Sequence, residues 1–404
     1  GTFRDVTAKT GTQDNLWGSS AAAIDFDKDG WLDLYVANYV HFDLKANKKC
    51  YAKSSRRDYC GPSSFEPQRD RFFRNRGDGT FEDVTNKLLI DYKPQSGLGV
   101  TSIDVNMDGW MDIYVTNDGK PNQLWINNKG KNFIDDGLFS GVALNNDGHA
   151  EASMGICAGD FDCDGDEDLF MTHIMTETNT LYVNDGKGVF EDRTISVGLS
   201  AASFPFTTFG TNWVDYNNDG WLDLFMANGA VLKIEKLALK GDPYPIHQPN
   251  QLFMNQGGKK FIDVSNQAKT VFDQAEVSRG AAFGDIDNDG DIDILVNNNN
   301  GPVRLLRNNT RGNDWLGIRL IDPKLKRDML GTKLILHREN GPPLLRYVRT
   351  EGSYCASNDP RILFGLGKQS KLKHLEIVWP DGIREIRKDL KKGAYSTIRK
   401  GEDK

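Results

Sequence analysis

Apolar residues in the first 310 positions occur in short runs of four to seven, bounded by Gly, Asn or Asp. Runs such as LYVAN (34–38), IYVTN (113–117) and LFMAN (224–228) are rich in β-branched and aromatic residues and show no helical period. This pattern is typical of short β-strands joined by tight turns. The 41 glycines of the 404-residue chain are consistent with many such turns.

One order of parts recurs five times, every 55 to 79 residues. An acidic loop leads into an apolar strand, which is followed by a hydrophobic pair with x-Asn, a Gly-rich turn and Phe-x-Asp. The acidic loops are DFDKDGWLD (25–33), DVNMDGWMD (104–112), DFDCDGDED (160–168), DYNNDGWLD (215–223) and DIDNDGDID (285–293). About four short strands per unit predict the blades of an all-β propeller over residues 1–310.

The two ends of the repeat array leave the number of blades open. The fifth unit ends at LLRN (305–308) without a Phe-x-Asp part, and FRDVT (3–7) at the start of the chain supplies that part. Either residues 3–7 close a five-unit ring, or upstream repeats are absent from this chain. Residues 311–404 lack the acidic loop and predict a small all-β domain, a sandwich. The alternative is two further blades, which would make seven.

The acidic loops share the spacing D-x-[DN]-x-D-G-x-x-D. Clustered carboxylates and carbonyls without His or Cys suit a hard cation, and flexible coordination by roughly six or seven oxygens favours Ca²⁺ over Mg²⁺. A solvated turn explains one such loop, but five with the same flanks predict about five Ca²⁺ sites. The predicted ligands are the side chains of positions 1, 3, 5 and 9 and the backbone carbonyl of position 7, namely Asp25, Asp27, Asp29, Trp31, Asp33, Asp104, Asn106, Asp108, Trp110, Asp112, Asp160, Asp162, Asp164, Asp166, Asp168, Asp215, Asn217, Asp219, Trp221, Asp223, Asp285, Asp287, Asp289, Asp291 and Asp293.

Charge and composition limit the classes of partner that the sequence predicts. The formal net charge is −7, and about five Ca²⁺ ions would bring it to about +3. Basic clusters such as RKDLKK (387–392) have no interleaved aromatic residues, so no nucleic-acid partner is predicted. The chain has no apolar run of about 18 residues, so no direct membrane insertion is predicted.

Cysteine spacing indicates one disulfide. Cys50 and Cys60 bracket a polar loop inside an insertion, residues 39–71, and a disulfide there would stabilise a segment with little core of its own. Cys157 and Cys163 are either a second pair or two buried thiols, and Cys355 is left over. The disulfide and Ca²⁺ sites suited to a millimolar ion predict an extracellular, cell-surface or periplasmic location.

The acidic loops and their apolar exit strands resemble FG-GAP/VCBS repeats, the units of integrin α-like propellers. NDWLGIRL (313–320), SYCASNDPRILFGLG (353–367) and WPDG (379–382) resemble the ASPIC/UnbV domain. Together these segments resemble the bacterial relatives of the cartilage acidic protein family over essentially the whole chain. The resemblance implies a secreted, Ca²⁺-binding, seven-bladed propeller with further repeats, upstream or in a partner chain, completing the ring. DMLGTKL (328–334) and Cys355 depart from the usual pattern of that family.

Two functions remain open. A binding or scaffold module would present its insertions, residues 39–71 and 229–250, to a protein or glycan partner. A Ca²⁺-dependent lyase or hydrolase would instead use polar loops on one propeller face, with His149, Glu151, His173, Glu177 and His247 converging. The chain has no HExxH, GxSxG or GxxxxGK[ST] motif, so an enzyme is the less favoured interpretation. A polar funnel would support catalysis, and a patch at the two insertions would support binding.

Overall fold

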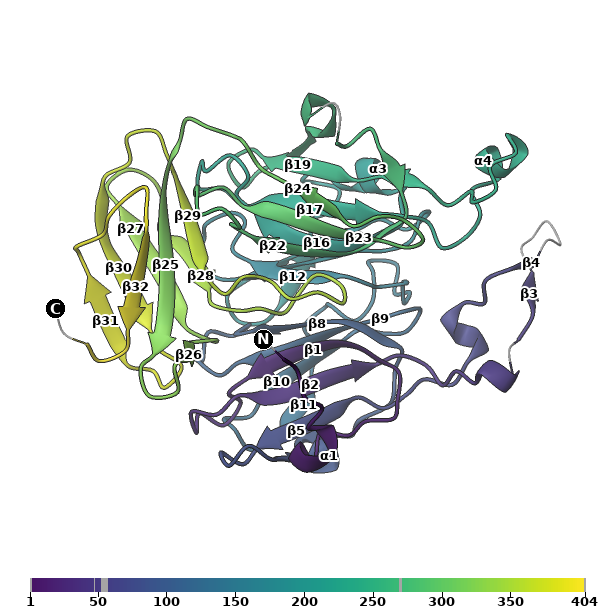
Figure 1. Ribbon diagram of the computed structural model, residues 1–404, viewed down its shortest axis with the longest axis horizontal. Coiled ribbons are helices and arrows are strands. Elements are labelled where there is room, and N and C mark those ends of the chain that lie inside the picture. The colour runs from purple at the N-terminus through teal and green to yellow at the C-terminus, as the bar shows by residue number, and fades with distance from the viewer. Residues whose placement is uncertain (1, 47, 52–56, 269–270, 403–404) are drawn as a thin grey trace.

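Short β-strands make up most of the regular structure, and the chain is all-β as its apolar runs predict. The structure is a computed structural model, and it describes every residue except 1, 47, 52–56, 269–270 and 403–404. Five sheets follow one another along an arc, and two further sheets lie beside them (Figure 1).

The five sheets are the predicted blades. The first contains β1 (Gly18–Ile24), β2 (Asp33–Asn38), β5 (Arg71–Asn75) and β6 (Phe81–Asp83). The second contains β8 (Gly97–Ile103), β9 (Asp112–Asn117), β10 (Gln123–Asn127) and β11 (Phe133–Asp135), with β7 (Leu89–Ile90) at its outer edge. The third contains β12 (Ile156–Gly159), β13 (Asp168–Met171), β14 (Thr180–Asn184) and β15 (Phe190–Asp192). The fourth contains β16 (Thr208–Val214), β17 (Asp223–Asn228), β19 (Gln251–Asn255) and β20 (Phe261–Asp263). The fifth contains β22 (Ser278–Gly284), β23 (Asp293–Asn298) and β24 (Arg304–Leu306).

Short elements occupy the connections. The α-helices are α1 (Thr7–Thr10), α2 (Thr85–Leu88), α3 (Ser200–Ser203) and α4 (Glu235–Leu239), and the 3-10 turns are η1 (Leu44–Ala46), η2 (Pro62–Ser64) and η3 (Ser265–Ala268). Two small ladders pair β3 (Cys50–Tyr51) with β4 (Arg57–Asp58) and β18 (Gln248–Pro249) with β21 (Ala275–Glu276). Within the described ranges, no helix has the length and apolar content needed to cross a membrane.

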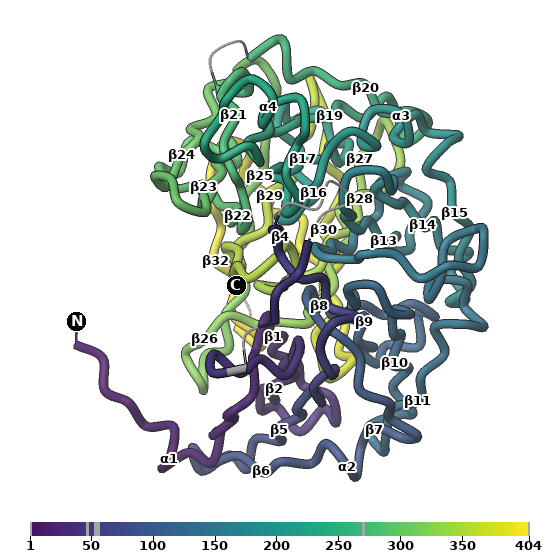
Figure 2. The backbone as a smooth tube through the Cα atoms, turned by 90° about the vertical axis from the view of Figure 1, so that its right-hand side faces the viewer, coloured from purple at the N-terminus to yellow at the C-terminus, as the bar shows by residue number. Residues whose placement is uncertain are grey.

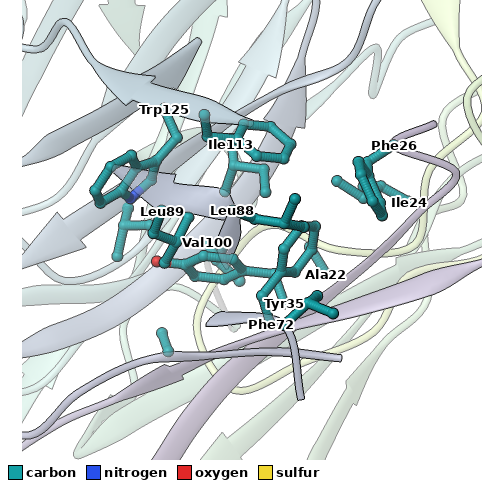
Figure 3. Packing of buried hydrophobic residues seen from close by; sticks show 14 residues of the cluster. Ala22, Ile24, Phe26, Tyr35, Phe72, Leu88, Leu89, Val100, Ile113 and Trp125 are labelled. Carbon is teal, nitrogen blue, oxygen red and sulfur yellow. The ribbon is translucent and has the colours of Figure 1, made fainter. Parts of the chain in front are cut away.

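The apolar cores lie between neighbouring blades. The innermost strands β1, β8, β12, β16 and β22 lie side by side through the middle of the arc (Figure 1). At the first interface, Phe26, Tyr35 and Phe72 of the first blade pack with Ile113 and Trp125 of the second (Figure 3). All five side chains are fully buried or nearly so. Each blade therefore depends on its neighbour to bury its apolar face.

An asparagine near the end of the third strand of a blade links that blade to the preceding one. Its side-chain amide donates a hydrogen bond of 2.8 to 3.0 Å to the carbonyl at loop position 2 of the preceding blade, in the pairs Asn127–Phe26, Asn184–Val105, Asn255–Phe161 and Asn308–Tyr216. Asn75 of the first blade donates within its own blade, to the Leu32 carbonyl at 2.9 Å. The x-Asn part of the repeat is therefore an inter-blade contact.

Replacing one linking asparagine is expected to weaken an inter-blade joint. Asn255 is 3% exposed, also donates to the Leu222 carbonyl at 2.9 Å and accepts the Gly258 N–H at 2.9 Å. Asn255→Ala should lower the free energy of unfolding in urea by about 2–4 kcal/mol, because buried backbone groups lose their partners. Asn75→Ala, which removes the in-blade bonds alone, should cost about 1 kcal/mol less. Equal losses would contradict the inter-blade role.

The fifth blade leaves exposed a face that the other blades bury. Ile286, Leu295 and Leu305 are 56%, 46% and 52% exposed. The residues that take the place of Leu295 in blades one to four, two positions after the last aspartate of the loop, are all fully buried: Tyr35, Tyr114, Phe170 and Phe225. The arc therefore ends on an apolar blade face.

Residues 3–7 do not complete the fifth blade, so the interpretation that they close a five-unit ring is wrong for this structure. Residues 2–6 form no strand, α1 begins at Thr7, and Phe3 is fully exposed. Figure 2 shows this segment running away from the blades. To complete the fifth blade, residues 3–7 would have to pair with the backbone of β24. Gly11, just after α1, instead lies against Phe81 of the first blade, which is at the other end of the arc from β24.

Residues 314–399 form a β-sandwich rather than two further blades. One sheet contains β25 (Asp314–Asp322), β26 (Arg327–Asp328), β29 (Ile362–Gly367) and β32 (Tyr395–Arg399). The other contains β27 (Lys333–Arg338), β28 (Leu344–Tyr347), β30 (Leu372–Val378) and β31 (Arg384–Arg387). The two sheets share one buried core that includes Leu316, Leu334, Phe364, Leu375 and Trp379.

The connection between β28 and β29 leaves the sandwich and runs along the inner strands of the arc (Figure 1). Residues 349–361 of this connection are called the axial loop below. The axial loop contacts all five blades, through the pairs Cys355–Ser20, Glu351–Ser102, Ser353–Ile156, Tyr354–Phe209 and Ser353–Ala281. The sequence predicted residues 311–404 as a separate small domain, but this loop inserts part of that domain along the inner strands of the propeller.

Candidate functional site

Each acidic loop is a tight turn between the innermost strand and the second strand of its blade. Position 4 has a left-handed backbone with φ between 55° and 61°, although it is never glycine: Lys28, Met107, Cys163, Asn218 and Asn288. Gly at position 6 also has positive φ, from 82° to 103°. These two positions turn the backbone sharply within the loop and are the same in all five blades.

The turn brings carboxylates together in three of the five loops. Candidate ligand oxygens lie within 4.8 Å of one another in the groups Asp25–Asp27–Asp29, Asp160–Asp162–Asp168 and Asp285–Asp287–Asp289. The second and fourth loops carry asparagine at position 3, where Asn106 and Asn217 accept the N–H of Asp108 at 3.1 Å and of Asp219 at 2.9 Å.

Buried carboxylate oxygens that accept no hydrogen bond indicate whether an acidic loop is suited to bind a cation. In the third loop, one oxygen each of Asp160, Asp162 and Asp166 is buried without a hydrogen-bond partner. Burial, followed by the neighbouring carboxylates, raises the pKa of Asp160 and Asp166 to about 7 and of Asp162 to about 6. In the first and second loops, Asp25, Asp27 and Asp104 have such an oxygen too. Anionic oxygens that lack donors are the ligands a hard divalent cation takes, so these residues fit Ca²⁺.

The last aspartate of each loop also has a structural role. Its Oδ2 accepts the N–H of loop position 2 at 3.0 to 3.4 Å, and its Oδ1 accepts the N–H of the linking asparagine position at 2.7 to 3.0 Å. These aspartates are all buried: Asp33, Asp112, Asp168, Asp223 and Asp293. Each carboxylate oxygen keeps lone-pair capacity beyond one N–H, so bracing the turn is compatible with metal ligation.

Arginines partly neutralise the two terminal loops. Arg74 lies 2.5 Å from an oxygen of Asp27 and 3.3 Å from one of Asp29, and Arg307 pairs with Asp287 and lies 3.6 Å from Asp289. The same position, just before the linking asparagine, is Ile126, Val183 or Met254 in the middle blades. The third loop therefore has three aspartates with donor-free buried oxygens and no arginine at this position, and it is the strongest candidate cation site.

The sandwich packs over the acidic loops. Tyr395 donates to Asp285 at 2.9 Å, and Asn313 donates to the Asn217 carbonyl at 2.8 Å. Arg327 donates to the Gly30 carbonyl at 2.8 Å. The loops thus form part of the surface that supports the C-terminal domain.

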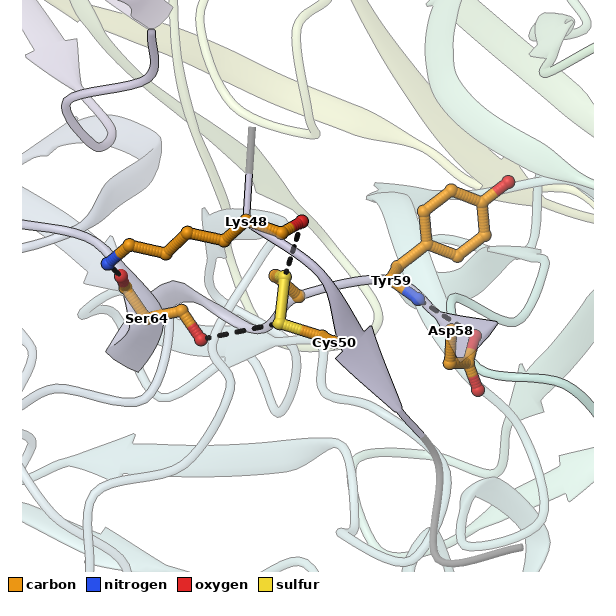
Figure 4. The surroundings of a disulfide bond; sticks show 6 residues. Lys48, Cys50, Asp58, Tyr59 and Ser64 are labelled. Atoms are coloured by element: carbon orange, nitrogen blue, oxygen red, sulfur yellow. Dashed lines mark hydrogen bonds between the residues drawn. A yellow bond between two sulfur atoms is a disulfide. The ribbon is translucent and has the colours of Figure 1, made fainter. Parts of the chain in front are cut away.

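The Cys50–Cys60 disulfide is present, as predicted, and its Cα atoms lie 5.2 Å apart (Figure 4). It closes the end of the first insertion, where Lys48 donates to the Ser64 carbonyl. Cys157 and Cys163 are free thiols, so of the two alternatives that the sequence left open the structure has the unpaired one. Cys157 is buried in the core between the third and fourth blades, and Cys163 takes the left-handed loop position.

Three of the five polar residues predicted for a catalytic face come together. His173 Nε2 lies 3.6 Å from Glu151 Oε2 and 3.1 Å from Ser153 Oγ, and Glu177 accepts the Ala152 N–H at 2.9 Å. His173 is 1% exposed, and burial lowers its pKa to about 4, which keeps the ring neutral. The His173 ring is thus enclosed by the blade, whereas Glu151 and Glu177 are partly exposed. The His149 N–H donates to Asn145 Oδ1 at 2.9 Å, and His247 is 3.6 Å from Asp242 in the second insertion.

The two insertions meet at one pocket of about 650 Å³. Lys233 of the second insertion donates to the Arg57 carbonyl of the first at 3.1 Å. The lining is aromatic and basic and comprises Trp17, Tyr39, Val40, Phe42, Lys48, Arg57, Asp58, Tyr59, Cys60, Phe65 and Lys233. The sequence predicted the two insertions as a recognition surface, and in the structure they meet at this one site, called the insertion pocket below.

The fold and its loops define an all-β repeat propeller with aspartate-rich turns and an attached sandwich. Residues 59–115, 104–171 and 160–226 match the FG-GAP-like repeat family, and residues 322–404 match the ASPIC and UnbV family. The chain therefore combines FG-GAP-like repeats with a C-terminal ASPIC and UnbV domain.

Curated relatives align with nearly the whole chain. Cartilage acidic protein 1 of Mus musculus is 27% identical over 94% of this chain and 54% of its own length, and that of Homo sapiens is 23% identical over 98% and 55%. The chain thus spans about half the length of these curated relatives. A solved lectin of Agrocybe aegerita, described as recognising terminal N-acetylglucosamine, aligns over 72% of this chain and 81% of its own at 16% identity. Its TM-score of 0.35 is too low to support an inference.

Proposed function

We propose that this chain is a calcium-braced binding module that holds a protein or glycan partner in the insertion pocket. The observation that carries the proposal is that both insertions, which interrupt an otherwise regular repeat, line the same pocket. Rigid sheets that display irregular loops are a common arrangement for recognition.

Calcium has a structural part in this proposal. The residues that would hold it are the loop aspartates and asparagines, with the third loop the strongest site and about five ions in all. A bound cation supplies positive charge that balances the clustered carboxylates. The chain's own residues do the rest, because the position-9 aspartates fix the turns and the linking asparagines join the blades.

The location that fits this function is outside the cytosol: extracellular, at the cell surface or periplasmic. Support comes from the Cys50–Cys60 disulfide, since such bonds persist mainly in oxidising compartments. Millimolar Ca²⁺ outside cells would also fill sites of modest affinity.

A further part of the proposal concerns the exposed face of the fifth blade. A blade from upstream repeats or from a partner chain would bury Ile286, Leu295 and Leu305 as the other four interfaces bury their equivalents. Leu295→Arg should therefore block association with such repeats in sedimentation velocity and leave the melting temperature of this chain unchanged. A large fall in melting temperature would show that the face is already packed.

Binding at the insertion pocket can be tested by comparing variants. Immobilised chain should retain a component of its native extracellular medium, and the double variant Trp17→Ala/Arg57→Ala should lose it. Tyr51→Ala/Lys49→Ala changes an aromatic and a cation in the same insertion, outside the pocket lining, and should keep the component. Retention that is the same for both double variants would refute the pocket as the binding site.

A further inference from the structure

We propose that the insertion pocket binds an anionic saccharide, one that carries carboxylate or sulfate groups on its sugar rings. This inference rests on the proposed binding function and specifies the chemistry of its ligand. Three features of the pocket carry it: exposed aromatic faces, cations without carboxylate partners, and a nearly complete lack of aliphatic lining.

The aromatic side chains offer rigid, partly exposed faces. Trp17, Phe42 and Tyr59 are 48%, 37% and 63% exposed. Trp17 packs edge-on against Tyr39 and Phe42 with ring centroids 5.4 and 5.7 Å apart, which fixes its orientation. A flat indole or phenol face suits the apolar C–H face of a sugar ring, and Tyr and Trp lose little conformational entropy when they bind.

The cations in the pocket are available to an anion. Lys48, Arg57 and Lys233 line it, and in the described part of the chain none of them pairs with a carboxylate. The one lining carboxylate, Asp58, accepts the N–H of Tyr59 at 2.9 Å. The described lining thus has three cations and one carboxylate, in a chain whose formal net charge is −7. Positive charge therefore gathers where the aromatic faces are, and it favours an anionic ligand.

The lining favours a saccharide over an acidic peptide. Grooves that hold peptides provide aliphatic pockets for side chains or a free strand edge for backbone pairing. Here the aliphatic lining is Val40 alone, and five aromatic residues supply the other large apolar surfaces: Trp17, Tyr39, Phe42, Tyr59 and Phe65. Aromatic platforms with flanking cations match rings that have apolar faces and charged substituents.

The test uses the full chain, in millimolar Ca²⁺ and at physiological ionic strength, with labelled hexasaccharides of heparin and hyaluronan. At least one of them should bind about tenfold or more tightly than a neutral cello-oligosaccharide of the same length. Trp17→Ala and Arg57→Ala should each weaken that binding by about tenfold. The matched controls Tyr51→Ala and Lys49→Ala should change it by less than about twofold.

Each other outcome overturns the saccharide assignment. Failure of both anionic hexasaccharides to bind does so, as does equal binding of the neutral one. Equal loss with Lys49→Ala and Arg57→Ala would indicate diffuse charge attraction rather than a pocket. A hexaglutamate peptide that binds more tightly than either hexasaccharide and depends on Trp17 would identify a peptide ligand. In that last case the pocket still has a binding function, with a different ligand. The binding function itself is refuted only if both double variants retain the component of the native medium equally well.

Discussion

Chelation of Ca²⁺ by EDTA is expected to lower the melting temperature of this chain by about 10 °C or more. In the third loop, Asp160, Asp162 and Asp166 each leave a buried carboxylate oxygen without a donor, so an empty loop concentrates uncompensated negative charge. A ligand present at 100 times its dissociation constant stabilises by about 2.7 kcal/mol per site, and several sites act together. Differential scanning fluorimetry with and without added Ca²⁺ measures the shift.

A pair of variants links this shift to the loops. Asp160→Asn/Asp162→Asn should reduce the Ca²⁺-dependent part of the melting temperature, because it removes two anionic ligands from the third loop. Glu82→Gln, which changes an exposed acidic residue of the first blade outside the loops, should leave it unchanged. A melting curve that does not respond to EDTA, on protein shown by elemental analysis to be metal-free, would refute the metal assignment.

The apo protein should also show a distinctive pH dependence. Burial raises the pKa of Asp25 to about 6 and of Asp160 and Asp215 to about 7, above the ordinary value near 4 in the unfolded chain. The folded apo chain therefore binds more protons than the unfolded chain between about pH 4 and 7, and its stability should fall as the pH rises through that window. Saturating Ca²⁺ should reverse the trend, because the metal binds the deprotonated carboxylates.

Arg349→Met is expected to lower the free energy of unfolding by about 3–5 kcal/mol. The Arg349 guanidinium lies 2.6 Å from Glu167 Oε2, with the two side chains 13% and 4% exposed, and it donates to the Ala158 carbonyl at 2.9 Å. Removing the arginine leaves the carboxylate of Glu167 buried at the joint between the axial loop and the third blade. Chemical unfolding in saturating Ca²⁺ measures the loss.

Two comparisons separate this buried pair from ordinary surface charge. Arg384→Ala breaks a pair with Glu376 in which the arginine is 73% exposed, and it should cost less than about 1 kcal/mol. Arg349→Met/Glu167→Met should recover much of the loss, since both charges leave the interior together. If Arg349→Met costs no more than Arg384→Ala, the axial loop is not anchored by this pair.

Much of this architecture was predictable because the repeat is local. The spacing around Asp25, Asp104 and their counterparts specifies the turn and the strands on either side, and each blade has the same order of strand, acidic loop and strand. The second role of Asp33 and its equivalents could not be read from spacing, because one of the two N–H donors to each aspartate comes from a strand that lies up to 42 residues away. The left-handed backbone at Lys28 and Met107 also has no residue signature, since any side chain that tolerates the strain can occupy it.

Contacts between distant segments were the part that could not be predicted. Arg74 and Arg307 occupy the position that is apolar in the middle blades, and their pairing with the acidic loops depends on side-chain reach across a sheet. The axial loop is a polar segment with no strand pattern, so its place between the blades follows from the tertiary fold alone. The insertion pocket likewise arises only when the blades bring Arg57 and Lys233 together.

The axial loop also bears on the order in which the chain folds during synthesis. Residues 18–306 leave the ribosome first and can form blade after blade, yet residues 349–361, which touch all five inner strands, emerge later. The inner faces of the nascent blades thus remain exposed to solvent until the C-terminal segment has been synthesised. Premature termination before residue 349 would accordingly leave a product with all its blades and an unfilled axis, and such a product is a natural substrate for chaperones and proteases.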